Sequence, residues 1–208
     1  IIIEALGQTI YMVFFSTLFA SVLGFILGII VTVTSPTGLR PNIFIYKSLD
    51  VIINVLRSFP FIILIVFIIP LTRAIVGTPI GETAAIVPLT IAAAPFVARI
   101  IESALKEVDP GVIEAAKSFG ASDFQIIYRI YLKEAFPAIL SGITLTMISI
   151  IGYSAMGGAL GAGGLGDIAI RYGYQAYKIP YLVVTSIILI IFVQIIQTIG
   201  NHLYKKLS

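Results

Sequence analysis

Long uncharged stretches constrain this chain more than any other feature of its sequence. The five apolar segments are residues 5–39, 50–72, 83–98, 135–166 and 179–204. Four of them contain no Asp, Glu, Lys or Arg, and the second carries only Arg57 after its first residue. Each supplies roughly 20 helical residues, enough to cross a hydrocarbon core of about 30 Å, the third by continuing past Arg99. The sequence therefore predicts an all-α integral membrane protein of one domain, residues 1–208, with five transmembrane helices.

The composition agrees with a membrane protein and excludes several kinds of site. Hydrophobic residues make up 59% of the chain, charged residues only 11%, and the mean hydropathy is +1.08. Soluble domains are about one-quarter charged. Cysteine is absent, so disulfides, thiolate metal sites and cysteine nucleophiles are excluded. The single histidine, His202, lies near Lys205 and Lys206 and is expected to be a solvated side chain rather than a metal ligand.

The distribution of basic residues predicts the orientation in the membrane. If the C-terminus is cytoplasmic, the inner flanks hold Arg40, Lys47, Arg57, Arg99, Lys106, Lys117, Arg129, Lys133, Lys205 and Lys206, and the outer flanks hold Arg73, Arg171 and Lys178. This bias places the N-terminus outside and the C-terminus in the cytoplasm. The first apolar segment lacks a preceding basic region and is too long for a signal-peptide core, so we expect a membrane helix there. Such dispersed basic residues also argue against nucleic-acid binding.

The connection between the third and fourth segments, about residues 106–134, is the largest inward-facing one and the richest in charge. Asp109 is placed to cap a helix whose first residue is Pro110, and Gly120 suits the left-handed position that ends it. Ser122 and Gln125 then form a capping-box pattern that begins a second helix. The sequence predicts two short cytoplasmic helices separated by a sharp break.

The first of these helices has a narrow apolar stripe. Val112, Ala115, Ala116 and Phe119 recur at helical spacing, while Glu114 lies off the stripe. From this pattern alone, a capped surface helix with no function is as good an interpretation as a docking element.

The order of residues in this loop resembles the EAA signature of the permease subunits of bacterial ABC importers. The resemblance rests on Glu114-Ala115-Ala116, on Gly120 six positions after the glutamate, and on Ile130 and Leu132. In that family the loop forms a coupling helix that docks in a groove of the cytoplasmic ATPase, which implies that Glu114, Ala115, Ala116 and Gly120 carry the coupling. Lys133 stands where the family usually has proline.

Three further segments resemble the methionine-importer branch of that family. They read NVLRSFPFIILIVFIIPLTRAIVGTPIG (residues 54–81), AAIVPLTIAAAPFVAR (84–99) and GYSAMGGALGAGGLGDIAIRYGY (152–174). The resemblance implies a non-catalytic permease in the bacterial cytoplasmic membrane that forms a homodimer within lipid and transports methionine. It also implies two ABC ATPase subunits, which hold ATP and Mg, and an extracytoplasmic methionine-binding protein. No cofactor is expected in this chain, and another amino acid or small polar solute remains the alternative cargo.

A glycine-rich stretch at residues 161–166 matches the G-x-G-x-x-G pattern of dinucleotide-binding folds. No β-strand is expected before it, and no acidic residue follows Asp167, so the context of a nucleotide site is missing. We expect these glycines to allow tight helix packing or an unwound backbone instead. Tyr153, Ser154 and Met156, just before them, are candidates for the translocation path or its gate; alternatively, Met156 fills a gap in the core.

Arg57 is the remaining candidate site residue. At the cytoplasmic end of the second segment it either pairs with an acidic group inside the bundle or extends its charge to the interface. Four prolines within the apolar segments are expected to mark kinks or helix ends: Pro60, Pro70, Pro88 and Pro95.

Several other functions lack the residues that they need. No G-x-x-x-x-G-K-[ST] motif is present, so the chain cannot hydrolyse ATP by P-loop chemistry. An intramembrane hydrolase requires a nucleophile with its base or paired carboxylates inside the spans, and no Asp, Glu or His is expected to be buried there. An ion channel or an ion-coupled transporter would normally show intramembrane ionisable residues or internal repeats, and neither is visible.

Overall fold

Helices form every regular element of residues 1–207, the part of the chain that this computed structural model describes. The α-helices are α1 (Ile2–Thr34), α2 (Ile43–Ser58), α3 (Phe61–Phe67), α4 (Ile69–Val76), α5 (Glu82–Lys106), α6 (Pro110–Ser118), α7 (Asp123–Ile126), α8 (Leu132–Gly158), α9 (Gly164–Asp167) and α10 (Ile179–Leu207). Two π-helical segments, η1 (Ile127–Tyr131) and η2 (Ile168–Gln175), extend α7 and α9. The all-helical prediction is confirmed.

Four helical runs are long and apolar enough to cross a membrane: α1, α5, the continuous run Asp123–Gly158, and α10. The second predicted span is not a straight helix. Helices α2 and α3 meet at an angle of 106°. Pro60 has no N–H to donate and holds Phe59 in an extended conformation, which ends α2 at Ser58. The kink or helix end expected at Pro60 is thus confirmed, and residues 50–72 are divided among α2, α3 and α4.

The fourth predicted span also ends earlier than expected. Helix α8 stops at Gly158 rather than at Gly166, and the chain turns back into α9. Gly161 and Gly163, between the two helices, and Gly164, the first residue of α9, all have positive φ, so α8 cannot continue through them. The uncharged run therefore did not predict the length of the helix, because glycine is as uncharged as leucine and far less helical.

The prolines fall both at helix boundaries and inside a helix. Pro60 separates α2 from α3, and Pro70 lies in the first turn of α4, where its missing N–H costs no hydrogen bond. Pro88 and Pro95 lie inside α5, which continues through both of them to Lys106. The third span therefore has its full predicted length beyond Arg99.

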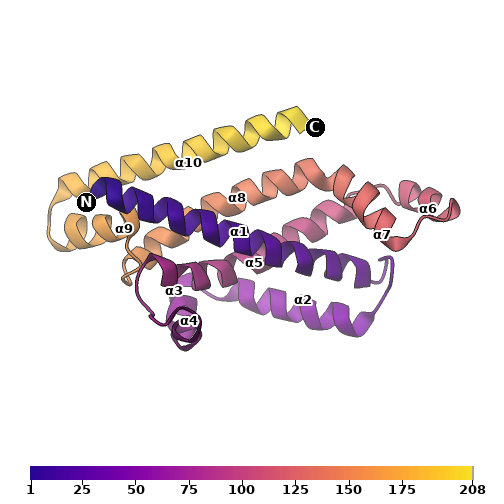
Figure 1. Cartoon of the computed structure of the whole chain (residues 1–208), viewed down its shortest axis with the longest axis horizontal. Coiled ribbons are helices and arrows are strands. Elements are labelled where there is room, and N and C mark those ends of the chain that lie inside the picture. The colour runs from indigo at the N-terminus through magenta and orange to yellow at the C-terminus, as the bar shows by residue number, and fades with distance from the viewer. Residues whose placement is uncertain (208) are drawn as a thin grey trace.

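The core of the fold is the packing of α1 against α5, which run side by side in Figure 1. Gly24 and Gly28 form the contact on α1: a Cβ atom on Gly24 would lie 2.5 Å from Val97 Cβ, and one on Gly28 would lie 2.8 Å from Ile101 Cβ. Helices in hydrocarbon associate through close packing, and small residues four apart let the two backbones approach. These two glycines therefore allow the closest approach of α1 to α5.

The two ends of the molecule differ in character. One end carries α6, α7 and the loop from α1 to α2; the other carries the N-terminus, α9 and η2 (Figure 1). Helix α10 runs along the edge of the bundle between the two ends (Figure 1). Most of its apolar side chains are exposed in the single chain, including Ile187, Ile190 and Ile195.

Candidate functional site

Helix α6 begins as its sequence predicts. The Asp109 carboxylate accepts a hydrogen bond from the Gly111 N–H at 2.8 Å, and Pro110 occupies the first turn. The cap supplies an acceptor for one of the N–H groups that have no partner at the start of a helix. Pro110 has no N–H and so requires no acceptor. Residues 107–109 alone separate α5 from α6, so α6 is held close to the end of the long helix.

The end of α6 is fixed by Gly120. This residue has a φ of +78°, and its N–H donates to the Lys117 carbonyl at 2.9 Å. The Ala121 N–H donates to the Ala116 carbonyl at 3.0 Å, which completes a Schellman motif. No atom lies within 4 Å of a Cβ built on Gly120. Glycine is therefore required at this position by the positive φ, and not because a side chain would clash.

A second capped helix follows at once. The Ser122 hydroxyl accepts from the Gln125 N–H at 3.3 Å, and the Gln125 side chain accepts from the Ser122 N–H at 2.9 Å. This reciprocal capping box confirms the predicted restart. Helix α7 passes through the π-helical segment Ile127–Tyr131 directly into α8, so the loop joins two long helices without a flexible link.

The apolar stripe of α6 does not pack as a stripe. Ile113 and Ala116 contact the core cluster beneath the loop, whereas Val112 and Phe119 are 45% and 91% exposed. Ala115 and the predicted coupling residue Glu114 are exposed as well. Of the four stripe residues, only Ala116 contacts the rest of the chain, and the other three are exposed. Most of α6 is free to meet a partner.

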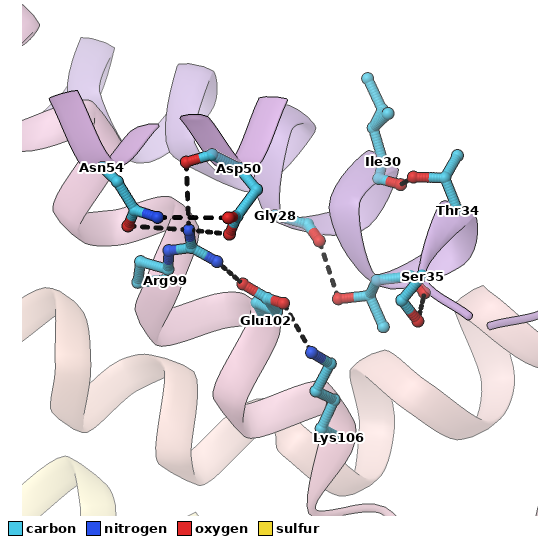
Figure 2. A network of polar contacts seen from close by, with 10 residues as sticks. Gly28, Ile30, Thr34, Ser35, Asp50, Asn54, Arg99, Glu102 and Lys106 are labelled. Atoms are coloured by element: carbon cyan, nitrogen blue, oxygen red, sulfur yellow. Dashed lines mark hydrogen bonds and ion pairs between the residues drawn. The ribbon is translucent and has the colours of Figure 1, made fainter. Parts of the chain in front are cut away.

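A charged network joins α2 to α5 just behind this loop (Figure 2). Arg99 on α5 forms an ion pair with Asp50 on α2, donates to Asn54 Oδ1 at 2.9 Å, and pairs with Glu102 Oε2 at 2.5 Å. Lys106 Nζ reaches the other oxygen of Glu102 at 2.6 Å. The Glu102 side chain is only 6% exposed, so both of its oxygens depend on these partners.

Sequence reasoning assigned Arg99 to a membrane flank and missed this network. A signal was present, because an arginine inside an otherwise apolar helix usually pairs within the bundle. For Arg57 the sequence left two alternatives, a pair inside the bundle or a charge that extends to the interface. Arg57 is exposed and is absent from the ion pairs of residues 1–207, which argues against the pair. It lines an open groove of about 310 Å³ together with Glu107 and Phe96.

The three candidate gate residues lie near the end of α8 but point in different directions. The Tyr153 ring stacks on Phe61 of α3 with the centroids 4.9 Å apart. The Ser154 hydroxyl is buried and donates to the Ile151 carbonyl within its own helix at 2.8 Å. Met156 is 51% exposed and fills no gap in the core of this chain. Met156 is thus accessible, Tyr153 is partly buried against the core, and the Ser154 hydroxyl already has a hydrogen-bond partner.

The glycine-rich end is a packed turn, not a nucleotide site. A Cβ on Gly158 would lie 2.4 Å from the Asp167 nitrogen, so α8 and α9 touch through their backbones. Gln8 of α1 accepts from the Gly164 N–H at 2.8 Å, and the Thr9 hydroxyl accepts from the Leu165 N–H at 2.9 Å. Side chains of α1 therefore accept hydrogen bonds from the first two N–H groups of α9. The close contact of α8 with α9 confirms the prediction of tight packing by small residues.

Comparison with known proteins identifies relatives over the whole chain. A family model described as binding-protein-dependent transport system inner membrane component matches residues 20–208. A protein of Vibrio cholerae, called probable D-methionine transport system permease protein MetI, is 50% identical over 208 residues, which cover 100% of this chain and 92% of the relative. The D-methionine transport system permease protein MetI of Escherichia coli is 46% identical over 158 residues, covering 76% of this chain and 73% of the relative.

Solved structures give the same picture. An inward-facing structure of the MetNI methionine ABC transporter superposes with a TM-score of 0.98 at 43% identity, covering 100% of this chain and 96% of that chain. A crystal structure of an amino acid ABC transporter superposes with a TM-score of 0.80 at 20% identity, covering 99% of this chain and 93% of that chain. The second likeness concerns the fold alone.

Proposed function

The chain belongs to the family of binding-protein-dependent transport system inner membrane components, and from that membership we propose that it is the permease subunit of an ATP-driven methionine importer. It is a multi-pass protein of the bacterial inner membrane and a non-catalytic subunit of an ABC transporter. The observation that carries the proposal is the close match, in sequence and in fold, to MetI and to the MetNI transporter over the full length of the chain.

We further propose five membrane crossings, with the bent pair α2–α3 as the second. The N-terminus then lies outside and the C-terminus in the cytoplasm, as the basic flanks favour. This orientation puts α6, α7 and the charged network on the cytoplasmic side, and α9 on the outer side. The candidate coupling residues Glu114, Ala115, Ala116 and Gly120 then face an ATPase.

The proposed assembly is a homodimer of this chain with two ATPase subunits and an extracytoplasmic methionine-binding protein. ATP and Mg belong to the ATPase, because this chain has no P-loop. Apolar side chains of α3, α4 and α10 are exposed in the single chain, among them Phe67, Ile75 and Ile190. Lipid and a second copy of the chain are the surroundings that such faces suit.

Coupling would pass from α6 into the bundle through short, stiff connections. Residues 107–109 join α6 to α5, and Arg40 Nε of the α1–α2 loop pairs with Asp123 Oδ2 at the start of α7, at 2.5 Å. The network around Arg99 then ties α5 to α2. An ATPase that binds α6 more tightly in one arrangement of the bundle would shift the population toward that arrangement.

The gate proposal rests on Tyr153 and Met156. Both lie near the outer end of α8, and Tyr153 stacks on Phe61 at the beginning of α3. A movement of α3 relative to α8 would break this stack and change access to Met156. Ser154, whose hydroxyl bonds within its own helix, is expected to support the helix rather than contact substrate.

The test is methionine uptake into proteoliposomes that contain the chain, its ATPase and its binding protein. We expect uptake to require ATP, and Glu114→Ala and Gly120→Val to abolish it while the complex stays assembled. The control is Gly77→Val, since Gly77 also has a positive φ, +86°, with no atom near its Cβ, but lies at the end of α4. Gly77→Val and Gly120→Val introduce the same backbone strain, about 1–2 kcal/mol. The two variants therefore differ only in position, after α4 or after α6.

The outcomes separate the parts of the proposal. Uptake lost in the Gly120 variant and kept in the Gly77 variant supports coupling through α6. If another small solute is taken up in an ATP-dependent way and methionine is not, then methionine is not the substrate, and the proposal of ATP-driven import still holds. Methionine uptake that is indifferent to ATP would contradict the importer as a whole.

A further inference from the structure

An open groove of about 1180 Å³ runs along the bundle between α1, α8 and the end of α10. Its walls are mostly apolar; Leu18, Val22 and Ile26 come from α1, and Phe136 and Ile143 come from α8. Val22, Ile26 and Phe136 are each about half exposed, so the walls are accessible. In a chain that spans the membrane, lipid acyl chains are the material that such walls contact.

The groove is apolar along its length but basic at one end. Arg129 of η1 and Lys133 of α8 line it four residues apart, which puts both side chains on one face of the same helical run. Neither residue belongs to any ion pair or side-chain hydrogen bond found within residues 1–207. The groove lining contains no acidic side chain. Two positive charges thus stand together without a partner at the mouth of an apolar groove.

We propose that this groove binds one anionic phospholipid, with the phosphate between Arg129 and Lys133 and the acyl chains along Val22, Ile26 and Phe136. All lipids supply similar chains, so discrimination among them must come from the head group, where two basic residues favour a net negative charge. Tyr128, next to Arg129, also lines the groove and is 65% exposed, and aromatic side chains of this kind favour the head-group region. Under the proposed orientation the lipid belongs to the cytoplasmic leaflet.

A second copy of this chain fits the groove less well than a lipid does. The apolar segments 135–166 and 179–204 contain no Asp or Glu, so neither offers a partner to Arg129 or Lys133. A helix seated there would bury two charges without compensation, which is costly in hydrocarbon. A lipid phosphate meets the same charges and leaves them hydrated at the interface.

The experiment uses the complete complex with its ATPase, reconstituted in nanodiscs of phosphatidylcholine with a minor share of phosphatidylglycerol. Native mass spectrometry of the released complex then counts each lipid retained. We expect the wild type to retain phosphatidylglycerol in preference to phosphatidylcholine, and R129Q/K133Q to lower that preference by about tenfold. The matched control Lys47→Gln removes an exposed positive charge on α2, away from the groove, and should leave the preference unchanged.

A second variant tests the apolar part of the site without a change of charge. Val22→Trp projects an indole into the groove from an exposed position, so it should displace the acyl chains and leave the fold intact. Loss of the retained phosphatidylglycerol in both variants supports the site. Absence of any preference in the wild type, or equal retention in wild type and R129Q/K133Q, overturns it.

A disulfide cross-link tests the alternative occupant, a second copy of the chain. The chain contains no cysteine, so an introduced cysteine can form a disulfide only with the same residue of another copy. If Val22→Cys forms a disulfide between two copies in the assembled complex, a second copy covers the groove and the lipid proposal is wrong. If no such bond forms under oxidising conditions and the lipid is retained, the groove is a lipid site. Lipid retention does not depend on uptake, so failure here leaves the importer proposal standing.

Discussion

Helices α5 and α10 are both apolar enough to span a membrane, yet they occupy opposite places in the fold. In the most apolar 18-residue window of each helix, 67% of the residues are buried in α5 and only 6% in α10. Helix α5 is built largely from small residues, among them Ala93, Ala94 and Ala98, and it carries Arg99 and Glu102. Helix α10 is dominated by isoleucine and valine.

The difference shows that hydrophobicity finds a membrane helix but does not say which helix lies at the centre. In hydrocarbon, large apolar side chains gain nothing by leaving lipid for protein, whereas small residues gain close packing, and charged residues need partners. Helix α5, the less apolar of the two, therefore lies at the centre of the bundle. The variants below test this contrast, from the largest expected effect to the smallest.

Arg99→Met should be the most damaging of these changes. It leaves the buried Glu102 with Lys106 alone and removes the link to Asp50, at an expected cost of about 3 kcal/mol in the free energy of unfolding. The measurement is the midpoint temperature of unfolding. The detergent-solubilised complex is heated, and size-exclusion chromatography measures how much of it stays intact. Arg57→Met is the control, because Arg57 is exposed on α2. An equal loss in both variants would mean that the ion pairs of Arg99 contribute no more to stability than an exposed arginine does.

Gly24→Leu should come second. A side chain at this position meets Val97 Cβ at 2.5 Å and the Ala94 carbonyl oxygen at 2.7 Å, so α1 must move away from α5. We expect a cost of about 2 kcal/mol, measured in the same thermal assay. Gly7→Leu changes a glycine of the same helix whose Cβ would meet nothing within 4 Å. If both variants unfold at the same temperature, the close approach of α1 and α5 contributes nothing to stability.

Ile190→Ala on α10 should have the smallest effect. Ile190 is 61% exposed in the single chain, so truncation is expected to cost less than about 0.5 kcal/mol. The same assay on the assembled complex measures it. A loss as large as that of Gly24→Leu would mean that a second copy covers α10 in the assembly, and the contrast with α5 would then hold for the isolated chain only.

The parts of the fold that the sequence predicted well are set by neighbouring residues. Asp109, Pro110 and Gly120 define the bounds of α6, and the Ser122–Gln125 capping box defines the start of α7. Each of these signals acts within a few residues along the chain, so it survives in any tertiary context. The apolar segments predicted which parts of the chain form long apolar helices, but not where the helices break within residues 50–72 and 135–166.

The parts that it missed depend on residues far apart in the chain. Arg99 and Asp50 are separated by 49 positions, and nothing local links them. Gly24 looks like any glycine in an apolar segment until Val97 is placed against it. The break after Ser58 was partly predictable, because Pro60 indicated a kink or a helix end, but the size of the bend between α2 and α3, 106°, was not.

The most direct test of the account measures whether ATP, bound by the partner ATPase, moves the end of this chain that is far from the coupling helix α6. Lys178→Cys puts a single spin label at the exposed start of α10, on the proposed outer side, in a chain without other cysteines. Double electron–electron resonance then measures the distance between the two labels of the homodimer in the complex with its ATPase. The account predicts that ATP changes this distance in the wild type and leaves it unchanged when Gly120→Val is added. An ATP-driven change that persists in the Gly120 variant would contradict coupling through α6.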